Sequence, residues 1–180
     1  MTTSGDVGTE IAPEVADDPQ LAARLDDLLH RACSLARALT DAEQAALSVD
    51  LDGDGHAARK FFNLSARYAR WRDFRVDPHG YGLHGIQLEP GEVVRLTQGE
   101  VEAHPAWTGF GGVADSHPPM RGWLATAVCG EDGRRYGLLQ LSDKSEGADF
   151  TAEDEDRIRE LAAFTGATLD ALRAARRPSS

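Results

Sequence analysis

The chain has 180 residues, 41% of them hydrophobic, which is enough for one well-filled core, and no apolar run approaches the roughly 20 residues that span a bilayer. Its 30 acidic residues outnumber the 19 basic ones, and the net charge of −11 repels nucleic acids and anionic lipids. With no secretory signal and only two distant cysteines, Cys33 and Cys129, we expect one cytoplasmic domain without a membrane partner, a zinc site or a disulfide framework.

The N-terminal segment differs in composition from the rest of the chain. Residues 1–18 contain five acidic residues and no Lys or Arg, which predicts a disordered acidic tail before a globular domain at 19–177. Apolar residues then recur at spacings of three and four, the pattern of an amphipathic helix, at Leu21, Leu25, Leu28, Ala32, Leu35 and Leu39. Two interpretations stay open: this seam packs on the domain's own sheet, or it pairs two chains.

Strand patterns occupy the middle of the chain. Residues 44–51 and 57–64 are apolar runs separated by an Asp-Gly-Asp-Gly turn, which predicts a hairpin. Further strands are expected at 93–96, 123–129 and 136–141, and the last two flank a second turn at 130–133. A final helix is expected after Phe150, because Thr151 and Asp154 can cap its first turn. The pattern therefore predicts an antiparallel sheet between two terminal helices.

Other patterns in the sequence carry weaker chemical signals. Asp50 to Gly55 is similar to the start of a calcium loop, but its twelfth position is Phe61 instead of Glu, so no calcium site is expected. Basic and aromatic residues alternate over 59–75, which suits either stacked bases or a half-buried surface. The histidines at 79, 84, 104 and 117 match no metal-ligand spacing, and His84, beside glycines, is the one most suited to a ligand.

Aromatic residues gather in a segment rich in glycine and proline. Trp107, Phe110, Met120 and Trp123 surround several glycines and the Pro118-Pro119 pair. This composition suits an adaptable apolar lid over a pocket, and it equally suits a small core beneath a long loop. Both interpretations stay open at this stage.

Two segments carry a resemblance to a known family. Residues 117–124 (HPPMRGWL) and 137–144 (GLLQLSDK) resemble GAF domains of bacterial sensor histidine kinases, and the similarity extends through 60–74 and 82–85. The resemblance implies an α/β (α+β) fold, with an antiparallel sheet of about six strands, terminal helices on one face and a loop-covered pocket on the other. It also implies that Lys144 and Asp154 form a buried ion pair between the last strand and the last helix.

The resemblance implies a stand-alone sensory or regulatory domain that binds a small molecule or a partner protein in signal transduction, but it fixes no ligand or cofactor. The residues expected at the pocket are Phe62, His84, Trp107, Phe110, Met120, Trp123 and Thr126. A homodimer is expected through Leu21, Leu25, Leu28, Leu35 and Leu39, with a kinase or regulator as a separate output protein.

Two alternative functions stay open beside the sensory one. The first is a constitutive dimerisation or adaptor module without a ligand. The second is a thiol-based redox enzyme similar to the free methionine sulfoxide reductases, which would use Cys33 or Cys129. Because the chain contains no nucleophile elbow, phosphate loop, HExxH or paired-carboxylate signature, we do not expect an enzyme.

Overall fold

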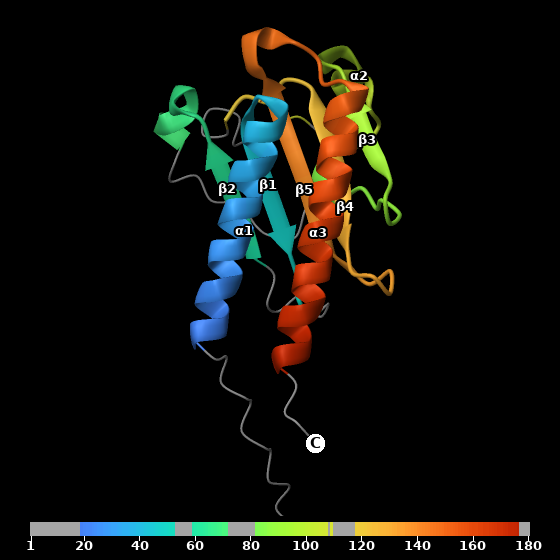
Figure 1. The fold of residues 1–180 in the computed structure, drawn as a ribbon. Helices are drawn as coiled ribbons and strands as arrows, with labels where there is room; N and C mark the ends of the chain where they lie inside the picture. Colours follow the sequence, from blue (N-terminus) through green and yellow to red (C-terminus); the bar gives the residue numbers. More distant parts are fainter. Residues whose placement is uncertain (1–18, 53–58, 72–81, 108, 110–117, 177–180) are drawn as a thin grey trace, which may run out of the picture.

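The computed structural model describes residues 19–52, 59–71, 82–107, 109 and 118–176, so the tail expected at 1–18 lies outside the described residues. The main elements in chain order are α1 (Pro19–Thr40), β1 (Ala42–Val49), β2 (Arg59–Leu64), β3 (Val93–Leu96), α2 (Gln98–Ala103), β4 (Trp123–Cys129), β5 (Arg135–Lys144) and α3 (Ala152–Arg176). Five of the roughly six expected strands lie in the described part, in the antiparallel order β2-β1-β5-β4-β3. Helices α1 and α3 run side by side across one face (Figure 1), which confirms the expected architecture.

The two faces of the sheet bury different sets of side chains, because successive residues of a strand point in opposite directions. Leu47 and Leu139 pair across β1 and β5 and belong to the core beneath the helices, with Leu124 of β4. Leu138 belongs instead to a second core on the opposite face, together with Trp123 and Ala125. The central strands are therefore buried on both sides, by helices on one face and by loops and α2 on the other.

Helix α1 buries a different stripe from the seam expected from its leucines. The core-facing residues are Leu25, Leu29, Ala32, Cys33 and Ala36, and Leu28 is half-buried at the edge of this stripe. Leu35 and Leu39 are 48% and 37% exposed, so packing on the domain's own sheet accounts for only part of the expected seam. The side chain of Leu21 lies outside the described part of the structure. No helix among the described residues is long and apolar enough to cross a membrane.

Helix α3 is anchored to the sheet near both of its ends. At its start, Lys144 Nζ donates to Asp154 Oδ2, and the same oxygen accepts from the backbone N–H of Thr151 at 2.8 Å. Farther along, Asp170 accepts from the Tyr136 hydroxyl and from the backbone N–H of Glu131. These contacts join α3 to both ends of strand β5 and to the β4–β5 turn.

Between these anchors the helix backbone lies directly on the sheet. A Cβ placed on Gly166 would lie 1.8 Å from the carbonyl oxygen of Cys129, a distance that no side chain tolerates. Only glycine therefore permits this approach of α3 to the end of β4.

We predict that Asp154→Ala destabilises the fold by about 3 kcal/mol, because it leaves Lys144 without its carboxylate partner and removes a helix cap. The Asp154 side chain is fully buried, and that of Lys144 is 16% exposed. The matched control is Glu155→Ala: Glu155 pairs with Arg95 at the surface, so its loss costs below about 1 kcal/mol. Urea denaturation compares the two variants, and equal small losses would contradict the prediction.

We also predict that stability falls at both pH extremes through the Tyr136–Asp170 contact. Burial, followed by the hydrogen bond to Asp170, raises the pKa of Tyr136 to about 12, and this bond lowers the pKa of Asp170. A raised pKa stabilises the fold below the ordinary value of 10.0, and this contribution is lost as the pH rises towards 12. The contribution of Asp170 is present above its ordinary value of 3.8 and is lost as the pH falls.

The measurement is the urea midpoint of wild type and Tyr136→Phe from pH 3 to pH 12. The variant is expected to be less stable at neutral pH and to lose less stability than wild type between pH 10 and pH 12. If the urea midpoints of the two proteins fell in parallel between pH 10 and pH 12, ionisation of Tyr136 would not contribute to the loss of stability.

Candidate functional site

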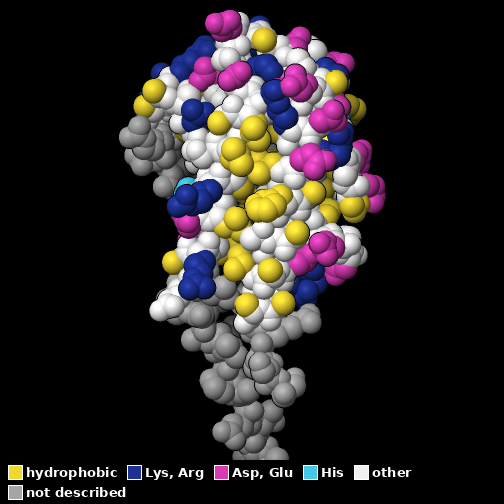
Figure 2. Space-filling model, in the orientation of Figure 1, with side chains coloured by type: hydrophobic (Ala, Val, Ile, Leu, Met, Phe, Trp, Pro, Cys, Tyr) yellow, Lys and Arg dark blue, Asp and Glu magenta, His cyan; other side chains and the backbone are white. Residues whose placement is uncertain are grey.

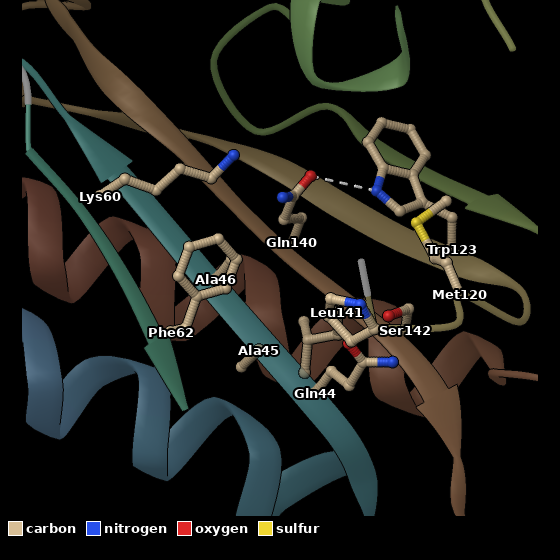
Figure 3. Close-up of a pocket in the computed structure, with 11 residues that line it drawn as sticks. Gln44, Ala45, Ala46, Lys60, Phe62, Met120, Trp123, Gln140, Leu141 and Ser142 are labelled. Carbon is tan, nitrogen blue, oxygen red and sulfur yellow. Dashed lines mark hydrogen bonds between the residues drawn. The ribbon is translucent and has the colours of Figure 1, made fainter. Parts of the chain in front are cut away.

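A hollow that is partly open to solvent lies on the sheet face opposite the helices (Figure 3), and the space in it is about 400 Å³ when the open mouth is included. Residues from strands β1, β2, β4 and β5 and from the 118–120 segment line it: Gln44, Ala45, Ala46, Lys60, Phe62, Pro118, Met120, Trp123, Gln140, Leu141 and Ser142. Most of the sheet residues among them are even-numbered positions of β1, β2 and β5, which share one face. Regular strands therefore supply most of the wall of this hollow.

The hollow exists because the central position of its floor carries a methyl group. Ala46 of β1 is paired with Phe62 of β2 on one side and with Gln140 of β5 on the other. Two large side chains thus rise on either side of a small one, and the space above Ala46 stays unfilled (Figure 3). Three residues in register across three strands define the shape of the site.

The wall on the β4 side is held by a buried hydrogen bond. The indole Nε1–H of Trp123 donates to Gln140 Oε1 at 3.2 Å, and both side chains are buried. Because the carbonyl of the Gln140 amide accepts this bond, its NH₂ group is turned towards Lys60 and Phe62 (Figure 3). On the β2 side, the Lys60 ammonium lies 5.4 Å from the centre of the Phe62 ring, a cation–π distance.

A second network ties the 118–120 segment to the end of β5. Gln44 Nε2 donates to the carbonyl oxygen of Pro119 and, at 2.8 Å, to Asp143 Oδ2. The same carboxylate oxygen accepts from the Tyr68 hydroxyl at 2.9 Å. Burial and this hydrogen bond raise the pKa of Tyr68 to about 12, so the phenol stays protonated as a donor at neutral pH. The backbone N–H of Asp143 also donates to the carbonyl of Arg121, a second link to this segment.

Ser142 contributes a polar side chain to the wall. Ser142 is 7% exposed and lines the hollow, and within the described part of the chain its hydroxyl forms no hydrogen bond. Ser142 Oγ is not one of the fully buried side-chain atoms that lack a partner, so this hydroxyl is accessible and can bind a molecule in the hollow.

The residues expected at a pocket from the sequence are only partly brought together. Phe62, Met120 and Trp123 line the hollow, although Trp123 belongs to strand β4 and the second core instead of a mobile lid. Trp107 packs against the second core and does not line the hollow. Thr126 is also not part of the lining, since its hydroxyl donates to the carbonyl of Glu92. Phe110 and the side chain of His84 lie outside the described residues.

Sequence analysis missed six polar or small lining residues: Gln44, Ala45, Ala46, Lys60, Gln140 and Ser142. A signal was present in β1 and β5, where Gln44, Gln140 and Ser142 lie beside apolar residues in strands that the core buries on both sides. Polar side chains at buried strand positions require partners, so this pattern marks a site. Ala46 carried no comparable signal, since its role depends on the strand register.

The basic and aromatic residues of the 59–75 stretch pair with one another or with nearby acids where the structure describes them. The Arg70 guanidinium lies 3.7 Å from the centre of the Trp71 ring, and Arg59 forms an ion pair with Asp26 of α1. These contacts match the interpretation of a half-buried surface, in which arginine stems cover rings. Among the described residues, no group of three or more His, Cys, Asp or Glu side chains is placed to hold a metal ion.

Comparisons with known proteins place this geometry in a family. Residues 24–169 match the model of the GAF domain. The fold is similar to a GAF domain of a phosphoenolpyruvate-protein phosphotransferase from Coxiella burnetii, with a TM-score of 0.55, 20% identity, and coverage of 89% of this chain and 98% of that one. It is also similar to a domain of a putative two-component sensor histidine kinase from Sinorhizobium meliloti, with a TM-score of 0.56 and 18% identity. That match covers 86% of this chain and 97% of the other.

A third similar structure is the blue-light-absorbing form of the PixJ GAF domain from Thermosynechococcus elongatus. Its TM-score is 0.57 at 14% identity, and the match covers 91% of this chain and 93% of that one. At these identities the solved structures support the fold alone, whereas the family model spans most of the described sheet and both terminal helices. The chain belongs to the GAF domain family.

Proposed function

We propose that this GAF domain is a sensory module that binds a small molecule in the hollow above Ala46 and reports its presence to a separate output protein. The observation that supports this most directly is the hollow itself, whose wall carries the accessible hydroxyl of Ser142. Neighbouring GAF structures include photoreceptor and sensor-kinase domains, which is consistent with a sensory role.

The contacts around the hollow offer a route from the ligand to the terminal helix. A molecule that enters must adjust to the Pro118–Met120 wall, which Gln44 connects to Asp143. The next residue, Lys144, is paired with Asp154 in the first turn of α3. A shift of this wall can therefore reach α3 through a few adjacent contacts. This requires that the wall has two conformations and that the ligand binds one of them more tightly than the other.

The alternative of a thiol-based enzyme has little support in the chemistry of the two cysteines. Burial raises the pKa of the Cys33 thiol to about 12, and its Sγ–H donates to the carbonyl of Phe61. Burial also raises the pKa of Cys129, which packs against the other core. A nucleophilic cysteine needs a lowered pKa, so both environments favour the unreactive thiol.

The helical face suggests that the domain also pairs with a second copy of itself. Figure 2 shows hydrophobic side chains along α1 and α3. The large hydrophobic residues of these two helices that are exposed are Leu35, Leu39 and Phe164, the last 68% exposed. Helices α1 and α3 pack side by side, so the same face of a second copy can pack on them about a two-fold axis. Such a contact would contain four helices, two from each copy. We propose that the output signal passes through this helical face.

We predict that Ala46→Leu abolishes small-molecule binding while the domain stays folded, because the larger side chain fills the hollow from its floor. Native mass spectrometry of protein purified from its own host is expected to show a retained small molecule in wild type and none in the variant. The control is Ser48→Leu, a change on the same strand and face outside the lining. A wild-type protein without a bound molecule, or an Ala46→Leu variant that retains it, would contradict the proposal.

For the helical face, we predict that wild type sediments as a dimer and that Phe164→Glu weakens dimerisation at least about 30-fold, because a charge would enter a desolvated contact. The control is Ser34→Glu, an exposed position on the part of α1 turned away from this face. Sedimentation equilibrium at micromolar concentrations measures both. A monomeric wild type would rule out pairing through this face.

A further inference from the structure

We propose that the end of the hollow at Gln44 and Ser142 binds an amide group of the ligand. The amide N–H donates to Gln44 Oε1, and its carbonyl accepts from the Ser142 hydroxyl. This inference rests on the proposed function of the hollow and adds the chemical class of its ligand. It follows from the register of β1 and β5 and from the hydrogen bonds that orient the Gln44 side chain.

Gln44 and Ser142 lie side by side in the wall. Gln44 of β1 is paired directly with Ser142 of β5, both residues line the hollow, and each is 7% exposed. Paired residues of neighbouring antiparallel strands project to the same face of the sheet, with Cβ atoms about 5 Å apart. Figure 3 shows the two side chains next to each other. One polar group of a ligand can therefore contact both.

The orientation of the Gln44 amide is fixed by its partners. Its Nε2 donates to the carbonyl oxygen of Pro119 and, at 2.8 Å, to Asp143 Oδ2. A backbone carbonyl only accepts hydrogen bonds, so the NH₂ group of Gln44 must be the part that faces Pro119. The oxygen Oε1 is thus turned away from these two acceptors.

Both Gln44 Oε1 and Ser142 Oγ are available to a ligand. Within the described part of the chain, neither atom takes part in a hydrogen bond. Neither is one of the fully buried side-chain atoms without a partner, so the small exposed fraction of each residue includes this atom. A molecule that fills the hollow buries both atoms, and it binds well only if it supplies their hydrogen bonds.

The two atoms differ in the hydrogen bonds that they can form. Gln44 Oε1 only accepts, whereas the Ser142 hydroxyl both donates and accepts. An amide carries a donor N–H and an acceptor carbonyl on adjacent atoms, so it can satisfy both groups at once. A carboxylate offers acceptors alone and would place its negative charge against Gln44 Oε1.

A cationic amine supplies donors but fits this end of the hollow less well than a neutral amide. Transfer of a charge into a site formed by residues that are more than nine-tenths buried costs more than transfer of a neutral group. The adjacent carboxylate oxygen, Asp143 Oδ2, already accepts hydrogen bonds from Gln44 and Tyr68. Its charge is therefore stabilised by these donors before any ligand binds.

The test uses four probes that share a phenyl ring: benzamide, acetophenone, benzoate and benzylamine. The ring suits the apolar part of the lining that Met120 and Trp123 provide. Acetophenone has a methyl group in place of the amide NH₂, so it keeps the carbonyl and cannot donate. Titration of ¹⁵N-labelled protein, followed by chemical shifts, gives the affinity of each probe.

The variants are Ser142→Ala, which removes the hydroxyl, and Ser142→Thr, which keeps it. The matched control is Ser48→Ala, because Ser48 is a serine on the same face of β1 as Gln44 and lies outside the lining. Gln44 itself is left unchanged, since its NH₂ group holds Pro119 and Asp143. The comparison of benzamide with acetophenone tests its oxygen instead.

We expect benzamide to bind and acetophenone to bind about 10-fold or more weakly, because acetophenone leaves Gln44 Oε1 buried without a donor. Ser142→Ala is expected to weaken benzamide about 5-fold, with Ser142→Thr close to wild type and Ser48→Ala unchanged. Benzoate and benzylamine are expected to bind more weakly than benzamide.

Three results would overturn the inference: acetophenone, benzoate or benzylamine binds as tightly as benzamide, Ser142→Ala leaves the benzamide affinity unchanged, or benzamide does not bind. The proposed function is tested separately by native mass spectrometry of wild type and Ala46→Leu. A retained molecule that Ala46→Leu removes, together with any of these three results, would show that the hollow binds a ligand of another class.

Discussion

The structure depends on a constraint at the centre of its sheet: β1 and β5 must bury both of their faces, while the two terminal helices cover only one. Leu47 and Leu139 lie under the helices, and Leu138 on the opposite face lies under loops and α2. On the second face, loops and α2 cover the sheet less completely than α1 and α3 cover the first, and the hollow lies on this second face. Ala46 defines this hollow, because it stands between two larger side chains in register.

The same constraint places the hollow next to the beginning of α3. Strand β5 contributes Gln140 and Ser142 to the wall of the hollow, Asp143 to the network behind it and Lys144 to the ion pair with Asp154. Within this one strand, residues that line the hollow are therefore followed by a carboxylate that Gln44 links to Pro119, and then by the lysine that pairs with α3. Under the proposed function, this short series of contacts would carry a binding event from the hollow to α3.

Much of this arrangement could be predicted from local patterns. Alternating apolar residues and turns located β3 and β4, and Thr151 with Asp154 marked the start of α3. Helix α2 was missed although Thr97 and Glu100 form a capping box, a local signal that was available.

The hollow could not be predicted in the same way, because it depends on the pairing of Phe62, Ala46 and Gln140 across three strands. Cross-strand register is a tertiary property, and one sequence read alone does not contain it. The most direct test of the account is an NMR titration of ¹⁵N-labelled protein with the small molecule that native mass spectrometry identifies in the wild type. The account predicts that the indole N–H of Trp123 and the side-chain amide of Gln140 shift most. Shifts confined to the α1 and α3 surface, or the absence of any at Trp123, would contradict it.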